Sequence, residues 1–148
     1  MFVSQVESRV NIVDEVKKWE EAIEIVSAPL LKDQCINENY VEEVKENISK
    51  ESYRFLVDHD IILAHSRPNR DVKKNGLSFL KVNKGVRFPN LRNKNIKLIF
   101  IISALSVREH MDWLQRFAKI MDDVHMVEKL NNATTKDEII EIFKKKIY

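Results

Sequence analysis

The chain has 148 residues, of which 44% are hydrophobic, and this length and composition are typical of one compact domain with a real core. Its 25 basic and 23 acidic residues give a net charge of +2 and are interspersed, which argues against a nucleic-acid-binding protein built on one basic face. The single cysteine, Cys35, excludes an internal disulfide and favours a reducing compartment, most simply the cytoplasm.

Glycine is scarce, and this limits the chemistry open to the chain. Gly76 and Gly85 are its two glycines, so it contains neither the dinucleotide-binding pattern G-x-G-x-x-G nor a P-loop. We expect no cofactor, and no metal because Cys35 has no Cys or His at ligand spacing. A phosphate group would have to be held by side chains or helix ends. The longest apolar run, residues 98–105, is too short to span a bilayer, and the start lacks the features of a signal peptide.

The first part of the chain predicts a strand followed by two helices. Residues 10–13, VNIV, are interpreted as a short strand. Apolar side chains at helical spacing from Trp19 to Leu30 predict a helix that Pro29 kinks or ends. Asn37 is a candidate cap for the second helix. The apolar face of that helix would consist of Tyr40, Val41, Val44 and Ile48.

The middle of the chain is rich in predicted strands. YRFLV (residues 53–57) and IILA (61–64) flank a turn at His59 and Asp60, and GLSFLKV (76–82) forms another strand. KLIFIISAL, residues 97–105, is apolar on both faces, which favours a strand buried in the middle of the sheet.

The last part predicts two capped helices. Ser106 and Glu109 match the capping box S-x-x-E, as do Thr135 and Glu138. The apolar stripe of the first of these helices would consist of Val107, Met111, Leu114, Ala118 and Met121, and the core-facing side chains of the second would be Ile139, Ile140 and Phe143. The alternation predicts an α/β single domain, a central mixed β-sheet with helices on both faces.

The stretch IILAHSRPNRDVKKNG, residues 61–76, contains the strongest candidate site. His65 directly follows an apolar strand, and in open α/β sheets ligands gather at the carboxyl ends of strands. His110 lies in the first turn of the helix capped by Ser106, where free backbone N–H groups favour an anion. If the two strands are neighbours, the histidines converge, and Arg67 supplies a forked donor for phosphate oxygens. These are the parts needed for phosphoryl transfer through a neutral histidine.

The same residues also admit a purely structural interpretation. A histidine that ends a strand is more often a boundary residue, and an arginine followed by Arg70, Lys73 and Lys74 is usually solvated. His59 and His125 are interpreted as surface or turn residues. From the residues alone, both interpretations stay open.

The sequence resembles the enzyme IIA domains of the sugar phosphotransferase system (PTS), mannitol/fructose superfamily. ILAHSRPNRDVKKNGLSFLKV is similar to their phosphohistidine segment, most of all in the ascorbate-type branch, where a strand ending in Pro-His precedes a small residue, Arg-Pro and V-x-K-x-G. LIFIISALSVREHMDWLQRFAKIMDD is similar to the segment with the second active-site histidine. WEEAIEIVSAPLL, NENYVEEVKENISKESYRFLV and NNATTKDEIIEIF resemble other parts of these domains. The resemblance implies one IIA type-2 domain over residues 1–148.

The resemblance also implies a phosphocarrier. His65 would accept a phosphoryl group from the phosphocarrier protein HPr and pass it to a sugar-specific IIB domain. His110 would orient or stabilise the phosphohistidine, and Arg67 would pair with phosphate oxygens. The domain would bind no nucleic acid and would meet the membrane indirectly, through the IIC component. A homodimer paired through an edge strand stays open.

Three positions depart from the family's pattern. Ala64 replaces the proline before the histidine, so that the local backbone is less constrained. Asp60 stands where many members have glycine and could place a carboxylate near the site. Asn47 stands where mannitol-type members carry an active-site arginine, so Arg67 would have to do that work alone.

Two functions are compatible with these features, and we favour the first. The chain could be a free-standing or detached IIA carrier, or a IIA-like regulatory domain of a PTS-regulated transcription regulator that is phosphorylated on the same histidine. A binding module with incidental histidines fits the full-length resemblance least well. The sugar is left open, because a IIA domain need not touch it.

Overall fold

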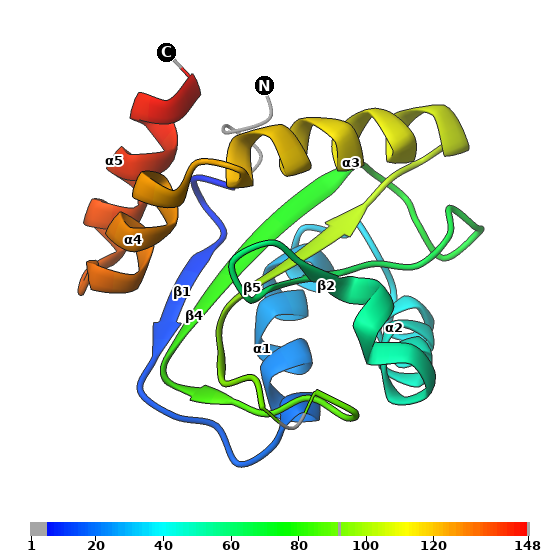
Figure 1. The fold of residues 1–148 in the computed structure, drawn as a ribbon. Coiled ribbons are helices and arrows are strands. Elements are labelled where there is room, and N and C mark those ends of the chain that lie inside the picture. The colour runs from blue at the N-terminus through cyan, green and yellow to red at the C-terminus, as the bar shows by residue number, and fades with distance from the viewer. Residues whose placement is uncertain (1–5, 92, 148) are drawn as a thin grey trace.

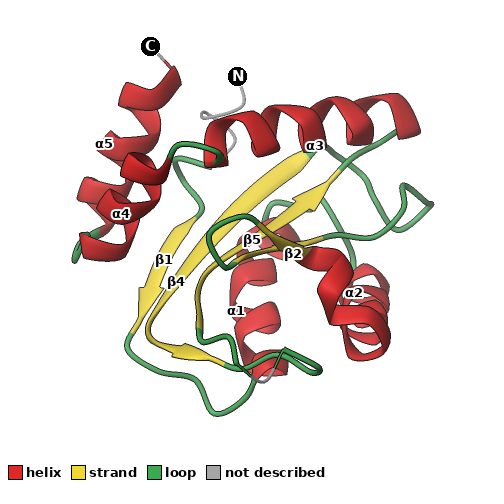
Figure 2. Cartoon of the chain, viewed as in Figure 1, coloured by secondary structure: helices red, strands yellow, loops and turns green. Residues whose placement is uncertain are grey.

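The computed structural model describes residues 6–91 and 93–147, and its layers are shown in Figure 1. The strands within these residues are β1 (Val10–Val13), β2 (Leu56–Val57), β3 (Ile61–Ala64), β4 (Gly76–Val86) and β5 (Ile96–Ser103). The helices are α1 (Trp19–Lys32), α2 (Glu38–Glu51), the short 3-10 helix η1 (Ser52–Phe55), α3 (Val107–Met121), α4 (Val124–Asn132) and α5 (Lys136–Ile147). The predicted class, a central mixed sheet with helices on both faces, is confirmed (Figure 2).

Strand β5 lies in the middle of the sheet, whose order is β1-β4-β5-β3-β2. It pairs antiparallel with β4 and parallel with β3. Its side chains alternate between two hydrophobic clusters: Leu98, Phe100 and Ile102 face α3, α4 and α5, whereas Ile99 and Ile101 face α1 and α2. This double burial explains the two-sided apolarity of the segment and confirms the predicted interior strand.

Helices α1 and α2 begin and pack largely as predicted. Pro29 lies inside α1, which continues to Lys32, so the proline does not end the helix. The side chain of Asn37 accepts a hydrogen bond of 3.1 Å from the backbone N–H of Tyr40 and thereby caps α2. The predicted apolar face of α2 is confirmed, since Tyr40, Val41, Val44 and Ile48 are all buried.

The hairpin from β2 to β3 turns through two residues with left-handed backbone conformations. His59 has φ 66° and Asp60 has φ 59°, and such a conformation costs roughly 1–2 kcal/mol for a residue other than glycine. The carboxylate of Asp60 pairs with Nζ of Lys94 at 3.0 Å, at the end of β3 opposite to His65. The suggestion that Asp60 brings a carboxylate to the site is therefore wrong. The predicted strand over 53–57 is shorter as well, because its first three residues belong to η1.

Helix α3 exposes part of the stripe that the sequence predicts as buried. Val107 is 69% exposed and Met111 is 50% exposed, and Ala118 is exposed too. The buried face instead contains Phe117, whose ring centroid lies 4.8 Å from that of Phe100 on β5, and Met121. The buried side chains of α3 thus lie in its C-terminal half, on another side of the helix than Ala118, and the apolar side chains at its start stay exposed.

Helix α4 is absent from the sequence-based prediction. Asp123 caps it by accepting from the backbone N–H groups of His125 at 3.0 Å and Met126 at 3.3 Å. His125 is on the exposed side of α4, so its interpretation as a surface residue is confirmed. The next helix, α5, begins directly after Thr135 of the predicted capping box, whose Oγ1 accepts from the N–H of Glu138 at 3.1 Å.

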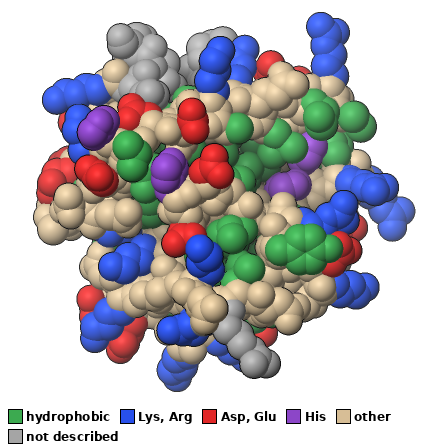
Figure 3. Space-filling model, viewed as in Figure 1, with side chains coloured by type: hydrophobic (Ala, Val, Ile, Leu, Met, Phe, Trp, Pro, Cys, Tyr) green, Lys and Arg blue, Asp and Glu red, His purple; other side chains and the backbone are tan. Residues whose placement is uncertain are grey.

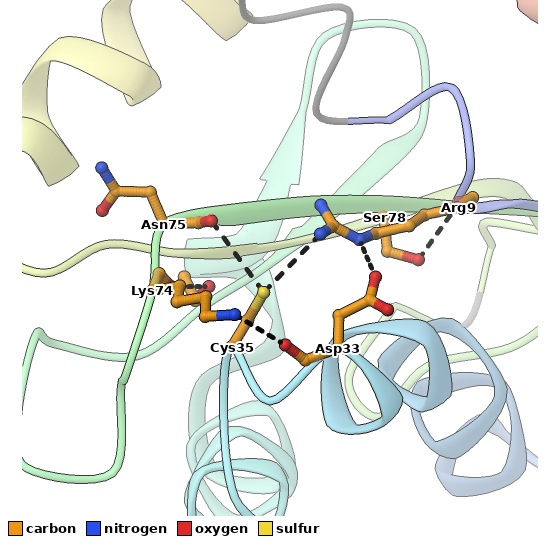
Figure 4. A network of polar contacts seen from close by, with 7 residues as sticks. Arg9, Asp33, Cys35, Lys74, Asn75 and Ser78 are labelled. Atoms are coloured by element: carbon orange, nitrogen blue, oxygen red, sulfur yellow. Dashed lines mark hydrogen bonds and ion pairs between the residues drawn. The ribbon is translucent and has the colours of Figure 1, made fainter.

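A polar network joins the start of β1, the end of α1 and the loop before β4 (Figure 4). Arg9 Nε donates to the Asp33 carboxylate at 2.8 Å, and its Nη2 lies 3.7 Å from Sγ of Cys35. The carbonyl oxygen of Cys35 accepts from the backbone N–H groups of Lys73 at 2.7 Å and Lys74 at 3.2 Å. The network therefore fixes the far end of the loop that begins with His65.

Candidate active site

A cavity of about 600 Å³ lies at the carboxyl edge of the sheet, where β3 ends. Its lining consists of Glu43, Asn47, Lys50, Glu51, Arg54, Phe55, His65, Ser66, Arg67 and His110. All three residues singled out from the sequence, His65, His110 and Arg67, are among them. The structure thus brings together residues that are up to 45 positions apart along the chain.

The parallel pairing of β3 with β5 brings the two histidines together. Ala64 is paired with Ile101, so both strands end at the same edge of the sheet. His65 follows β3 directly, and His110 lies in the first turn of α3 after the Ser106 cap, whose Oγ accepts from the N–H of Glu109 at 3.2 Å. The centroids of the two imidazole rings are 5.1 Å apart. In Figure 3 a pair of neighbouring histidines lies at the surface between hydrophobic and basic side chains.

His65 is held in one tautomer by its own strand. Its Nδ1 is 2.9 Å from the carbonyl oxygen of Leu63, and a carbonyl can only accept, so Nδ1 carries the proton. Phe55 packs edge-on against the ring, with centroids 5.0 Å apart. Burial lowers the pKa of His65 and the nearby His110 lowers it further, against the opposing effect of the Leu63 carbonyl. The ring is therefore neutral at pH 7, with a free lone pair on Nε2.

His110 faces the same cavity in a drier environment than a surface histidine. Its Nδ1 is buried and has no hydrogen-bond partner among the described residues. Burial lowers the pKa of His110 as well. A neutral imidazole at this place can offer one N–H group to an anion in the cavity.

The residue after His65 is fixed by contacts that the sequence did not indicate. Ser66 donates its hydroxyl to the carboxylate of Glu43 in a short hydrogen bond and accepts from Nδ2 of Asn47 at 3.3 Å. Its backbone N–H donates to the hydroxyl of Tyr40 at 3.0 Å. Glu43 also accepts from Nδ2 of Asn69 at 3.0 Å. Helix α2 therefore holds the segment that contains both His65 and Arg67.

The cavity contains more positive charge than the sequence reasoning assigned to it. Arg67 lines it and is exposed, and Lys50 and Arg54 also line it. The expectation that Arg67 would have to act alone stays a prediction, but two further cations lie where they could share that work. Arg54 was overlooked because it precedes β2, and its closeness to His65 depends on how η1 packs against β3.

Two further classes of site find no support in residues 6–91 and 93–147. No group of three or more His, Cys, Asp or Glu side chains there could hold a metal ion. None of the helices in this part of the chain is long and apolar enough to cross a bilayer.

Comparison with known proteins agrees with this arrangement. The family described as "Phosphoenolpyruvate-dependent sugar phosphotransferase system, EIIA 2" matches residues 6–146. The mannitol-specific cryptic phosphotransferase enzyme IIA component of Escherichia coli K12 is 26% identical over 136 residues, covering 92% of each chain. The ascorbate-specific PTS EIIA component of the same organism is 19% identical over 134 residues, covering 90% of this chain and 87% of the relative.

Solved structures show the same fold. The solution structure of the E. coli mannitol-specific cryptic enzyme IIA superposes with a TM-score of 0.89 at 25% identity, covering 98% of this chain and 99% of the other. Mannitol enzyme IIA of E. coli, in its complex with phosphorylated enzyme IIB, superposes with a TM-score of 0.77 at 22% identity, covering 93% and 94%. Because the family match spans nearly the whole chain, the protein belongs to the type-2 enzyme IIA family of the phosphoenolpyruvate-dependent sugar phosphotransferase system.

Proposed function

We propose that the chain, as one domain, is a phosphocarrier in which Nε2 of His65 receives a phosphoryl group from one protein and delivers it to another. The observation that supports this most is the hydrogen bond between Nδ1 of His65 and the Leu63 carbonyl, at 2.9 Å. It leaves Nε2 unprotonated, and the lowered pKa of His65 keeps it so at neutral pH. Nε2 is thus the nucleophile of the cavity.

The transfer requires one bond to form and one to break. The lone pair of Nε2 forms the bond to phosphorus while the bond between phosphorus and the donor breaks. The electron pair of that broken bond stays with the donor. His110 donates an N–H to a phosphoryl oxygen, and the guanidinium of Arg67 pairs with the same charge. Nδ1 keeps its proton and goes on donating it to the Leu63 carbonyl, so the ring holds its orientation throughout.

The partners that we propose are HPr as the donor and a PTS IIB domain as the acceptor. The family match and the E. coli mannitol IIA–IIB complex support a IIB partner. Exposed apolar side chains next to His110 also favour protein partners over small molecules, since Leu105, Val107 and Met111 are 53%, 69% and 50% exposed. The single cysteine supports a cytoplasmic location.

The test is phosphorylation of the purified chain by enzyme I, HPr and phosphoenolpyruvate. His65→Ala should abolish labelling, because the phosphoryl group bonds to this residue. His110→Ala should still label, roughly a hundredfold more slowly, because it loses one donor to the transition state. The control is His125→Ala, on the exposed side of α4, which should label like the wild type.

Normal labelling of His65→Ala would refute the assignment and move the acceptor elsewhere. If His65 is labelled in the wild type, a second assay of transfer from the labelled chain to a IIB component distinguishes the carrier function from the regulatory function. A chain that labels at His65 but passes nothing to IIB has the regulatory function instead.

A further inference from the structure

Besides Arg67, two cationic side chains line the cavity, Lys50 and Arg54, and their ion pairs differ. Lys50 Nζ pairs with Glu46 Oε1 at 2.9 Å, and Glu46 is not among the residues that line the cavity. Arg54 Nη1 lies 3.5 Å from Oε2 of Glu51, which does line it. Charged N–H to carboxylate hydrogen bonds are usually about 2.7–2.9 Å long, so Arg54 is held loosely, and by a carboxylate at the cavity wall.

The backbone that presents Arg54 is fixed more firmly than its side chain. In η1 the hydroxyl of Ser52 donates to the carbonyl of Ile48 at 2.8 Å. Phe55, which directly follows Arg54, is 7% exposed and packs against the ring of His65. The Arg54 side chain itself is 65% exposed. A fixed Cα beside the proposed nucleophile and an exposed, loosely paired guanidinium allow the side chain to move without any change of fold.

The carboxylate of Glu51 is the anion that Arg54 contacts in this structure, at the wall of the cavity. Its Oε2 also accepts from the hydroxyl of Tyr53 at 3.0 Å, so that it keeps one partner when Arg54 leaves. A phosphoryl group on His65 would carry close to two negative charges into the same cavity. It would repel Glu51 and compete with it for the guanidinium.

We propose that Arg54 is a second phosphoryl-binding arginine, which exchanges Glu51 for the phosphoryl oxygens when His65 is phosphorylated. This inference rests on the proposed role of His65. Arg67, in the loop after β3, and Arg54, in the turn before β2, approach the phosphoryl group from two sides. Each offers a planar fork of N–H donors, which a lysine in its place cannot.

The test uses phosphoramidate, a small phosphoryl donor, so that no protein interface contributes. Nε2 of His65 bonds to phosphorus as the phosphorus–nitrogen bond of phosphoramidate breaks and ammonia leaves. Arg54→Gln should label about 10- to 100-fold more slowly than the wild type, and Arg54→Lys should lie between them. The matched control is Arg116→Gln on α3, because Arg116 is also half-exposed and pairs with an acidic residue on its own helix, Asp112, at 3.0 Å.

A double-mutant cycle tests the exchange itself. Glu51→Gln should label about two- to fivefold faster than the wild type, because it removes the competing carboxylate. This gain should be clearly smaller in the Arg54→Gln background, where only the repulsion between Glu51 and the phosphoryl group is left to remove. A gain of the same size in that background would overturn the exchange, as would no gain in the wild-type background. Equal rates for Arg54→Gln and Arg116→Gln would overturn the role of Arg54. Failure of the wild type to label at His65 would instead refute the proposed function.

Discussion

The burial of His65 and His110 gives the chemistry a characteristic pH dependence. Burial lowers the pKa of both rings below the ordinary value of about 6.5. Protonation, which would remove the nucleophilic lone pair, therefore sets in at lower pH than in a free histidine. Between about pH 8 and 6.5 we expect the rate of labelling by phosphoramidate to fall less than the reaction of free imidazole does. The measurement is the initial rate across this range, with free imidazole as the control for the ionisation of the donor. A fall that matches that of imidazole would contradict the prediction.

Glu43 holds the segment that contains His65, the nucleophile of the proposed function, through hydrogen bonds to other residues of that segment. Its carboxylate accepts from Ser66 and Asn69, on either side of Arg67. Glu43→Ala should slow labelling about 10- to 100-fold, because the segment after His65 loses its geometry. It should also lower the free energy of unfolding by about 1–3 kcal/mol, since two donors lose their acceptor. The measurements are labelling kinetics and urea denaturation.

The control for Glu43 is its neighbour Glu42. That side chain is 67% exposed and pairs with Lys45 at 2.7 Å, away from the site. Glu42→Ala should leave the labelling rate within about twofold of the wild type and change stability by no more than about 0.5 kcal/mol. Equal labelling rates for Glu43→Ala and Glu42→Ala would show that Glu43 does not position the segment.

At the residue scale, the sequence predicted those site residues whose position follows from a strand end or a helix cap. His65 ends an apolar strand, and His110 follows the capping box at Ser106, so local patterns located both. Glu43 and Arg54 could not be found in this way, because they reach the site through tertiary packing. The contact between Glu43 and Ser66 spans 23 positions and requires α2 to pack against the sheet in one particular register.

A buried lysine connects the sheet to the end of α4. Lys81 on β4 is 4% exposed, and its Nζ donates to the carbonyl oxygens of Asn131 at 2.7 Å and Ala133 at 2.5 Å. Burial lowers the pKa of Lys81. Lys81→Met should lower the free energy of unfolding by about 1–3 kcal/mol, because two carbonyls lose their donor. Urea denaturation measures the loss, and labelling at His65 should continue, since α4 lies away from the cavity.

The control for Lys81 is Lys97 on the neighbouring strand β5, which is exposed. Lys97→Met removes the same charge without removing a buried donor, so it should change stability by no more than about 0.5 kcal/mol. If both variants lose the same stability, the contribution of Lys81 would come from its charge and not from its two carbonyl partners.

At the element scale, periodicity predicted where helices begin better than which side they bury. The predicted start of α3 after its Ser106 cap was correct. The predicted burial of Val107 and Met111 was wrong, because the core does not extend under the start of this helix. Helix α4 was missed because it has nine residues and its buried side chains, Met126, Val127 and Leu130, make no long repeat. Its existence depends on α3 ending at Met121 and on the sheet surface that α4 then covers.

For the whole molecule, the exposed apolar start of α3 should matter to partners and not to chemistry. Val107→Glu should raise KM for phosphorylated HPr by about fivefold or more, because it places a charge on a desolvated interface. It should leave labelling by phosphoramidate unchanged, since Val107 does not line the cavity. Comparing the two donors separates docking from catalysis.

Val124→Glu provides a closely matched control. Val124 is 45% exposed and is the first residue of α4, as Val107 is of α3, so that glutamate is tolerated at both helix starts. Val124→Glu should therefore change neither donor's kinetics. If Val107→Glu slowed phosphoramidate as much as HPr, the substitution would act on the cavity and the docking role of this turn would be wrong.

Because of the network around Cys35, the rate at which the one thiol of the chain is modified should report on the loop that follows His65. Cys35 is 1% exposed, and its backbone carbonyl accepts from the N–H groups of Lys73 and Lys74, at the end of the loop that carries Arg67. Because the residue is buried, a thiol-modifying reagent should reach the sulfur only when the structure around it opens locally, and lifting of this loop is one such opening. If phosphorylation binds Arg67 to the phosphoryl group on His65, thiol modification of Cys35 should become slower. The ratio of the modification rates without and with phosphorylation would then express how strongly the phosphoryl group stabilises the closed loop.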